Sequence, residues 1–152
     1  MSVNTRYEST AMRKILIPVD GSESSQRAVQ YAIQLVKSGA SIEVHLLNVQ
    51  FPIVSGDIRR FVTQAMIDGY HRAEGDEALK AARRALEDAG VRFESAIVVG
   101  HIAEAIAQYA TKVQCDSIVM GTRGMGPMKN LVLGSVATQV IHGSDVPVTL
   151  VK

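Results

Sequence analysis

The sequence VMGTRGMGPMKNLVLGSV, residues 119–136, joins an apolar run to a glycine-rich segment and then to the start of a helical pattern. Glycine lacks a Cβ atom, so its backbone N–H groups can approach an anion closely. A helix start adds unpaired N–H donors and the positive end of the helix dipole, and Arg123 and Lys129 add full positive charges. We therefore predict a strand, a glycine-rich loop and a helix N-terminus that together suit a phosphate group.

Two common phosphate-binding motifs do not match this stretch. A Walker A loop requires G-x-x-x-x-G-K-[ST], and the sequence contains no such string. A dinucleotide fingerprint requires G-x-G-x-x-G after the first strand, whereas Lys129 stands where the third glycine belongs and the stretch follows a late strand. A loop whose glycines serve only to form turns is the alternative interpretation.

Length and composition indicate a single globular domain, residues 1–152. Hydrophobic residues make up 47% of the chain, which argues against disorder. A net charge of +1 without a basic run disfavours nucleic acid as a partner, and no apolar stretch reaches the length of about 18 residues that a membrane helix needs. Residues 1–12 are polar and unpatterned, so we expect a flexible N-terminal tail and a cytoplasmic protein without membrane insertion.

Short apolar runs alternate with helical patterns along the rest of the chain. The runs predict five strands: Lys14–Asp20, Ile42–Val49, Arg92–Val99, Asp116–Gly121 and Val146–Val151. Apolar spacing predicts helices from Ser22 or Ser24 to Gly39, Phe61 to Ala89, His101 to Val113 and Ser135 to His142, with a kink or break possible at Gly75 in the second. Residues 50–60 form a polar connection. This alternation predicts an α/β fold with a parallel sheet and right-handed crossovers.

The glycine spacing of the opening stretch is that of a known family motif. Gly121, two residues, Gly124, nine residues and then Gly134-Ser135 resemble the G-2x-G-9x-G-[ST] motif of the universal stress protein family, in its ATP-binding branch. The resemblance extends from Lys14 to Lys152. It implies a three-layer α/β/α fold of the Rossmann-like, adenine nucleotide alpha hydrolase-like kind, whose open five-stranded parallel sheet has the strand order 3-2-1-4-5.

That strand order would bring two distant parts of the chain to one crevice. Ligands of open α/β sheets bind at the carboxyl ends of strands where the order reverses. There the resemblance implies a nucleoside contact by Asp20 and an adenine contact by the Val49 backbone, and the Ser135 hydroxyl and nearby N–H groups would hold phosphate. The full expected set is Pro18, Val19, Asp20, Val49, Met120, Gly121, Arg123, Gly124, Gly134, Ser135, Val136 and Ala137. The alternative role for Asp20 is capping of the next helix. The alternative for Arg123 is an exposed side chain that is solvated and contacts no phosphate.

The expected function is nucleotide-dependent signalling in a stress response. The chain would bind ATP, with Mg²⁺ or Mn²⁺, and hydrolyse it slowly or not at all, because no catalytic set is evident. An ATP or AMP hydrolase or a phosphotransferase of the same α/β group is the alternative. The four histidines are dispersed, and Cys115 has no histidine or charge cluster beside it, so we expect structural or surface histidines and an inert thiol.

The last predicted strand suggests self-association. Pro147 cannot donate to a sheet ladder, which favours an edge position for Val146–Val151. An exposed apolar edge pairs readily with another chain, and two-fold pairing satisfies both edges. The family resemblance implies the same arrangement, a homodimer through the last strand, and an unidentified protein partner is also compatible with signalling.

Overall fold

The computed structural model describes residues 12–53, 56–122 and 133–152. Within these ranges all strands are parallel and form one sheet with the order β3-β2-β1-β4-β5. The predicted order 3-2-1-4-5 is therefore confirmed. The strands are β1 (Arg13–Pro18), β2 (Ile42–Gln50), β3 (Phe93–Val99), β4 (Ser117–Gly121) and β5 (Val148–Val151).

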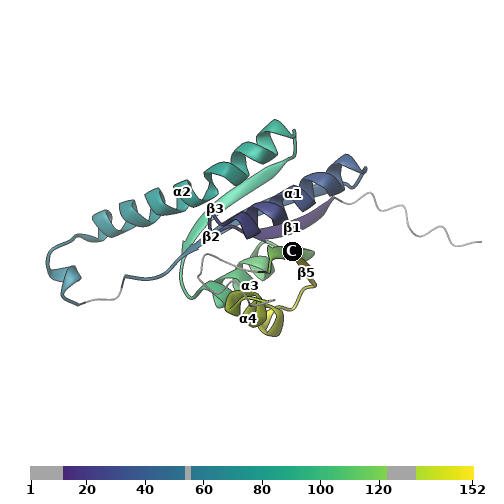
Figure 1. Ribbon diagram of the computed structural model, residues 1–152. Helices are drawn as coiled ribbons and strands as arrows, with labels where there is room; N and C mark the ends of the chain where they lie inside the picture. Colours follow the sequence, from purple (N-terminus) through teal and green to yellow (C-terminus); the bar gives the residue numbers. More distant parts are fainter. Residues whose placement is uncertain (1–11, 54–55, 123–132) are drawn as a thin grey trace, which may run out of the picture.

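Helices cover both faces of the sheet, which makes three layers (Figure 1). The helices α1 (Glu23–Lys37) and α2 (Gln64–Asp88) pack on one face, and α3 (Ile102–Lys112) and α4 (Ser135–Gly143) pack on the other. A short 3₁₀ helix, η1 (Ile58–Arg60), lies in the connection that the sequence presents only as polar. The Rossmann-like α/β/α architecture predicted from the sequence is confirmed.

The central strand explains why its sequence is continuously apolar. Ile15 and Ile17 of β1 belong to the core under α1 and α2, whereas Leu16 between them belongs to the core under α3 and α4. All three side chains are buried because successive residues of a strand point to opposite faces. Truncating one of them to alanine would cost about 2–5 kcal/mol.

Several predicted boundaries were wrong by one or two residues. The first strand ends at Pro18 and not at Asp20, because Gly21 turns the chain with φ +83° and the N–H of Ser22 donates to Oδ1 of Asp20. The last strand begins at Val148 and not at Val146. The second strand continues past Val49 to Gln50.

The second predicted helix differs from α2 in its start and in its middle. It begins at Gln64 instead of Phe61, because the Thr63 hydroxyl oxygen accepts from the N–H of Met66 and caps the first turn. No break occurs at Gly75, since the helix runs on to Asp88. A Cβ at Gly75 would lie 2.7 Å from Ile97 of β3, so this glycine allows α2 to lie close to the sheet.

Candidate functional site

The candidate site lies at the carboxyl edge of the sheet, where β1 and β4 separate. These central strands pair through only two residues each, Ile15 with Ser117 and Leu16 with Ile118. Beyond that pairing β1 continues to Pro18 and β4 to Gly121. Strand order reverses between β1 and β4, and this is the position at which open α/β sheets bind ligands.

The turn after β1 places one acidic side chain at this edge. Val19 is buried and its N–H donates to the carbonyl oxygen of Leu47 at 2.8 Å, which ties the end of β1 to β2. Asp20 follows as an exposed residue whose Oδ1 accepts from the N–H of Ser22 at 2.9 Å. Asp20 is therefore not the cap of α1, since Ser22 is the N-cap residue and Asp20 accepts from the N–H of that residue in the turn before the helix.

The N-terminus of α1 is capped by its own chain. Ser22 is the N-cap residue, and its Oγ accepts from the N–H of Ser25 at 3.2 Å. The Ser25 hydroxyl in turn donates to the carbonyl oxygen of Ser22 at 2.9 Å. This helix start is next to the site, but one of its backbone donors is already satisfied by a side chain.

The start of α4 is different. Its N-cap is Gly134, which has no side chain to accept from the first turn, and among the described residues no side-chain cap is formed. The N–H of Gly134 donates to the carbonyl oxygen of Thr122 at 2.6 Å, which holds the start of α4 beside the end of β4. Ser135 is exposed, Val136 is half-buried and Ala137 is buried in the first turn.

Gly121, the last residue of β4, has a packing role that the motif alone did not reveal. A Cβ on it would meet the Oγ of Ser24 and would lie 2.6 Å from the backbone carbon and oxygen of that residue. The first turn of α1 therefore contacts β4 so closely that only glycine fits without movement. The next residue, Thr122, is buried, and its N–H donates to the carbonyl oxygen of Val151.

Two amide side chains that sequence reasoning missed connect the strand ends. Asn48 is 3% exposed, and its Nδ2 donates to the carbonyl oxygen of Val19 at 2.8 Å. The Nε2 of Gln50 donates to Oδ1 of Asn48 at 2.7 Å. The N–H of Gly100 donates to the carbonyl oxygen of Gln50 and brings in the end of β3. The signal in the sequence was polar Asn48 inside an apolar run and polar Gln50 directly after the predicted strand.

The remaining predicted residues are distributed around this edge. Pro18 ends β1 and is half-buried, Val49 is half-buried within β2, and Met120 is buried in the core beneath α3 and α4. Arg123 and Gly124 lie outside the described residues. The structure thus brings together the β1 turn, the end of β4 and the start of α4, and it leaves Met120 facing the core.

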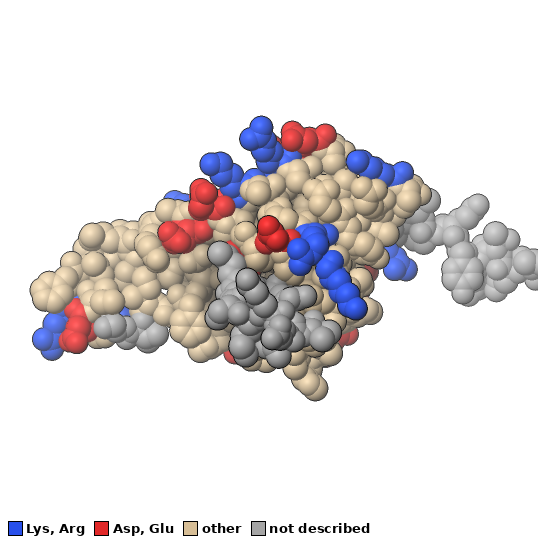
Figure 2. All heavy atoms as spheres, in the orientation of Figure 1, with Lys and Arg blue, Asp and Glu red and all other residues tan. Residues whose placement is uncertain are grey.

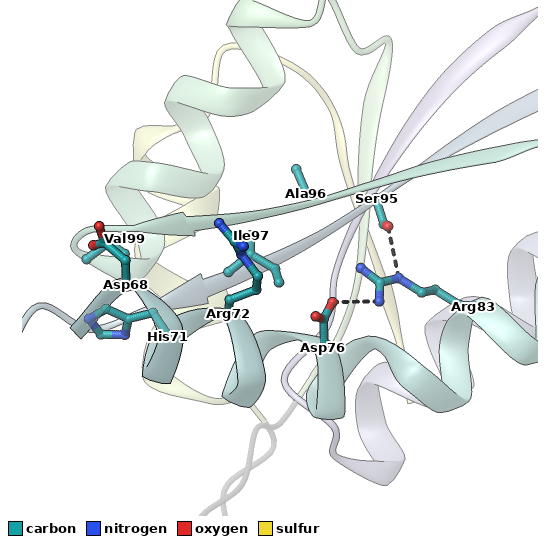
Figure 3. A pocket seen from close by; sticks show the side chains of 9 residues that line it. All are labelled: Asp68, His71, Arg72, Asp76, Arg83, Ser95, Ala96, Ile97 and Val99. Carbon is teal, nitrogen blue, oxygen red and sulfur yellow. Dashed lines mark hydrogen bonds and ion pairs between the residues drawn. The ribbon is translucent and has the colours of Figure 1, made fainter. Parts of the chain in front are cut away.

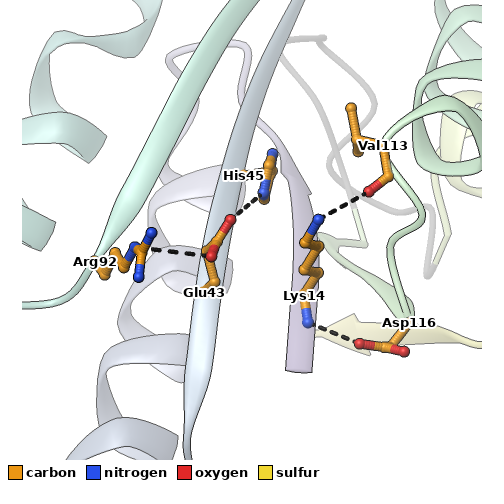
Figure 4. Close-up of polar contacts among 6 residues, drawn as sticks. All are labelled: Lys14, Glu43, His45, Arg92, Val113 and Asp116. Carbon is orange, nitrogen blue, oxygen red and sulfur yellow. Dashed lines mark hydrogen bonds and ion pairs between the residues drawn. The ribbon is translucent and has the colours of Figure 1, made fainter. Parts of the chain in front are cut away.

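A separate polar cluster lies at the amino ends of the strands, opposite the candidate site (Figure 4). His45 Nε2 lies 2.8 Å from Oε1 of Glu43, and this hydrogen bond, with smaller contributions from nearby positive charges, lowers the pKa of the Glu43 carboxyl. The N–H of Lys14 donates to the carboxylate of Asp116, and its Nζ donates to the carbonyl oxygen of Val113. These contacts join the amino ends of β1, β2 and β4 and take no part in the candidate site.

The single cysteine also lies near the amino ends of the strands, just before β4. Cys115 is 5% exposed, and burial raises the pKa of its thiol to about 11. Burial, with the neighbouring Cys115 and Glu94, also raises the pKa of Tyr109. Among the residues that the structure describes, no group of three or more histidine, cysteine, aspartate or glutamate side chains is placed to hold a metal ion.

Charged side chains of both signs are interspersed on the visible face instead of forming one basic patch (Figure 2). Of the helices in the described ranges, none is both long enough and apolar enough to cross a membrane.

Comparison with known proteins identifies the family. The model of the universal stress protein family matches residues 12–152. The chain belongs to the universal stress protein family. Universal stress protein MJ0531 of Methanocaldococcus jannaschii is 35% identical over 146 residues, which cover 92% of this chain and 82% of that protein.

Solved structures show the same universal stress protein fold. The structure of MJ0577, a universal stress protein of Methanocaldococcus jannaschii, superposes with a TM-score of 0.79 at 31% identity and covers 93% of this chain and 96% of its own. A universal stress protein in complex with cAMP superposes with a TM-score of 0.67 at 28% identity, covering 92% of this chain and 97% of that one.

Proposed function

We propose that this universal stress protein binds an adenine nucleotide between β1 and β4, with the phosphates at the start of α4. The observation that carries the proposal is the start of α4, which is held beside β4 yet has glycine as its N-cap and no side-chain cap from the part of the chain that the structure describes. Backbone N–H groups in the first turn of such a helix favour an anion. The cAMP complex of a relative supports an adenine nucleotide as the ligand.

The nucleoside end would lie against the ends of β1 and β2. In a parallel ladder the backbone groups of alternate residues point to opposite neighbours. The carbonyl oxygen of Leu47 accepts from Val19, so the groups of Val49, two residues later, also point toward β1. Since β1 ends at Pro18, these groups face the space where that strand has turned away, which suits hydrogen bonding to a base edge.

We propose ATP as the ligand, together with Mg²⁺ or Mn²⁺. Such ions are typically held by one or two carboxylates plus the phosphates of the substrate. Asp20 fits this donor set, because it places a carboxylate on the exposed turn after β1, at the same edge as the start of α4. The ion would neutralise phosphate charge, and the chain would bind and orient the nucleotide with slow hydrolysis or none.

The test is calorimetric titration with Mg-ATP of the full chain and of two matched variants. Gly134→Val fills the space before the first turn of α4, and we expect at least tenfold weaker binding with an unchanged circular dichroism spectrum. Gly143→Val, at the other end of the same helix where a Cβ meets nothing within 4 Å, should bind as the wild type does. Equal binding by Gly134→Val and the wild type would overturn the phosphate assignment.

Hydrolysis is measured on the same samples. Turnover well below about 1 s⁻¹, the lower end of the usual enzyme range, agrees with a binding module. Turnover above that value would favour a hydrolase of the same α/β group. Asp20→Ala should weaken Mg-ATP binding with little change in the melting temperature, since the side chain is exposed.

A further inference from the structure

Among the described residues β3 is an edge strand, and one side of its backbone pairs with no other strand. The N–H of Val44 donates to the carbonyl oxygen of Arg92, and the N–H of Gly100 donates to that of Gln50. These bonds fix which residues of β3 point their backbone groups toward β2, because the direction alternates in a parallel ladder. By that alternation Ser95, Ile97 and Val99 direct their N–H and carbonyl groups outward, away from the sheet.

The three residues that carry these groups line a groove between β3 and α2 (Figure 3). The groove has a volume of about 440 Å³ and is lined by Asp68, His71, Arg72, Asp76 and Arg83 of α2 and by Ser95, Ala96, Ile97 and Val99 of β3. One wall is thus a strand edge and the other is a polar helix face. An edge of this kind is a template for an additional strand.

One end of the groove is closed by a polar contact. Arg83 donates from Nε to Oγ of Ser95 at 2.9 Å and from a terminal nitrogen to Oδ1 of Asp76 at 2.8 Å. This contact holds α2 against β3 and leaves Arg83 and Asp76 paired with each other. An incoming chain would therefore meet its charge partners further along α2.

Two exposed charges of opposite sign remain along the helix wall. Arg72 forms no ion pair within the described residues, and the carboxylate of Asp68 accepts only a neutral hydrogen bond from Gln64. They are one helical turn apart, a rise of about 6 Å. Side chains two residues apart on one face of a strand are separated by about 6.6 Å, so the two spacings match.

The groove also contains an unsatisfied buried polar atom. His71 is 5% exposed, and its Nδ1 has no hydrogen-bond partner within the described ranges of the chain. Buried polar atoms are rarely left without a partner, since this costs about 1–3 kcal/mol. Val99 at the same end is 51% exposed, which offers an apolar contact beside the polar ones.

We propose that this groove binds an extended peptide segment of a partner protein as a sixth strand on β3. The peptide hydrogen-bonds to the outward backbone groups of Ser95, Ile97 and Val99. On its α2 side it carries an acidic and a basic side chain two residues apart, which pair with Arg72 and Asp68. This surface is at the opposite side of the sheet from β5 and the predicted dimer, and none of its lining residues belongs to the proposed nucleotide-binding set.

The test is fluorescence polarisation with a labelled peptide in which lysine and glutamate, two residues apart, alternate with valine. We expect saturable binding to the full chain with a Kd below about 1 mM. Val99→Pro removes an outward donor and leaves the ladder with β2 intact, so binding should be lost. Leu150→Pro at the other edge of the sheet should bind as the wild type does.

Charge reversal tests the occupant's chemistry. Arg72→Glu should weaken binding of the lysine–glutamate peptide about threefold to tenfold. The same variant should bind a peptide with two lysines more tightly than the wild type does. Lys80→Glu, on the same helix but outside the groove, is the matched control. Equal binding of the peptide and of its version N-methylated on alternate residues would overturn strand addition, as would unchanged binding by Val99→Pro. A failure of Mg-ATP titration would leave these outcomes unaffected.

Discussion

Gly121 shows at the scale of one residue that a motif position serves packing as well as any ligand. Its missing Cβ leaves room for Ser24 at the first turn of α1, including the backbone of that residue. We predict that Gly121→Ala lowers the free energy of unfolding by about 1–3 kcal/mol, because backbone atoms relieve such a clash poorly. Urea unfolding of the nucleotide-free protein measures this loss.

The matched control for Gly121→Ala is Gly143→Ala, where a Cβ meets nothing within 4 Å. We expect its unfolding midpoint to stay close to that of the wild type. Equal stability of Gly121→Ala and Gly143→Ala would contradict the packing role and would leave Gly121 as a residue needed only for the ligand.

Cys115 gives a second prediction at this scale. A thiol with a pKa of about 11 is almost entirely protonated at pH 8, whereas an unperturbed cysteine with a pKa of about 8.5 is partly thiolate. We expect alkylation of the folded protein by iodoacetamide at pH 8 to be much slower than that of the urea-unfolded chain. Comparable rates in the two states would show that the thiol is neither buried nor perturbed.

At the scale of one helix, α2 contains two glycines with opposite expected effects. Gly69 is exposed with no atom near a prospective Cβ, so Gly69→Ala should stabilise by up to about 1 kcal/mol through helix propensity. Gly75→Ala gains the same propensity but drives a Cβ to 2.7 Å from Ile97, which costs about 1–3 kcal/mol. Thermal unfolding of both variants should show shifts of opposite sign.

If both Gly69→Ala and Gly75→Ala raised the melting temperature, the close packing of α2 on β3 would be contradicted. If both variants had lower melting temperatures than the wild type, Gly69 would have a role beyond the helix backbone. The pair therefore separates helix propensity from contact with the sheet within one element.

The elements themselves could largely be predicted from sequence, and the errors have local causes. The continuous apolar run at Ile15–Ile17 predicted a strand covered on both faces, and it is one. The break considered at Gly75 was wrong because a helix can contain a glycine where another element approaches closely. The strand end at Asp20 was wrong because the aspartate accepts from the backbone of its own turn.

The candidate site was harder to predict because its contacts join distant segments. The strand order came from a family resemblance, since local patterns do not determine which strands are neighbours. Asn48 was missed because its partner, the carbonyl oxygen of Val19, follows the end of another strand, and nothing near Asn48 in sequence marks that contact. Gln50 was missed with it, because its side chain donates to Asn48 on the same strand. Ser24 was considered only as a possible start of the first helix, whereas it packs against Gly121, 97 positions later by numbering.

The whole molecule has a second edge, β5, through which we expect homodimerisation. The N–H of Ile118 donates to the carbonyl oxygen of Pro147, and the N–H of Thr122 donates to the carbonyl oxygen of Val151. Because the direction alternates along a parallel strand, Val148 and Leu150 point their backbone groups outward. Leu150→Pro removes one outward donor without breaking the ladder to β4. We predict a dimer for the wild type and a monomer for Leu150→Pro in light scattering at equal concentration.

Val99→Pro on the β3 edge is the control for this experiment and should remain a dimer. A monomeric wild type would exclude homodimerisation at the concentration used. An undiminished dimer of Leu150→Pro would place the interface elsewhere on the chain.

The central claim, a nucleotide held between β1, β4 and the start of α4, is tested most directly on the protein as purified. The full chain is isolated without added nucleotide and denatured, and any released adenine nucleotide is identified by chromatography and mass. We predict a stoichiometric amount of ATP from the wild type and little from Gly134→Val. A wild-type protein that releases no nucleotide and shows no heat on titration with Mg-ATP would contradict the account.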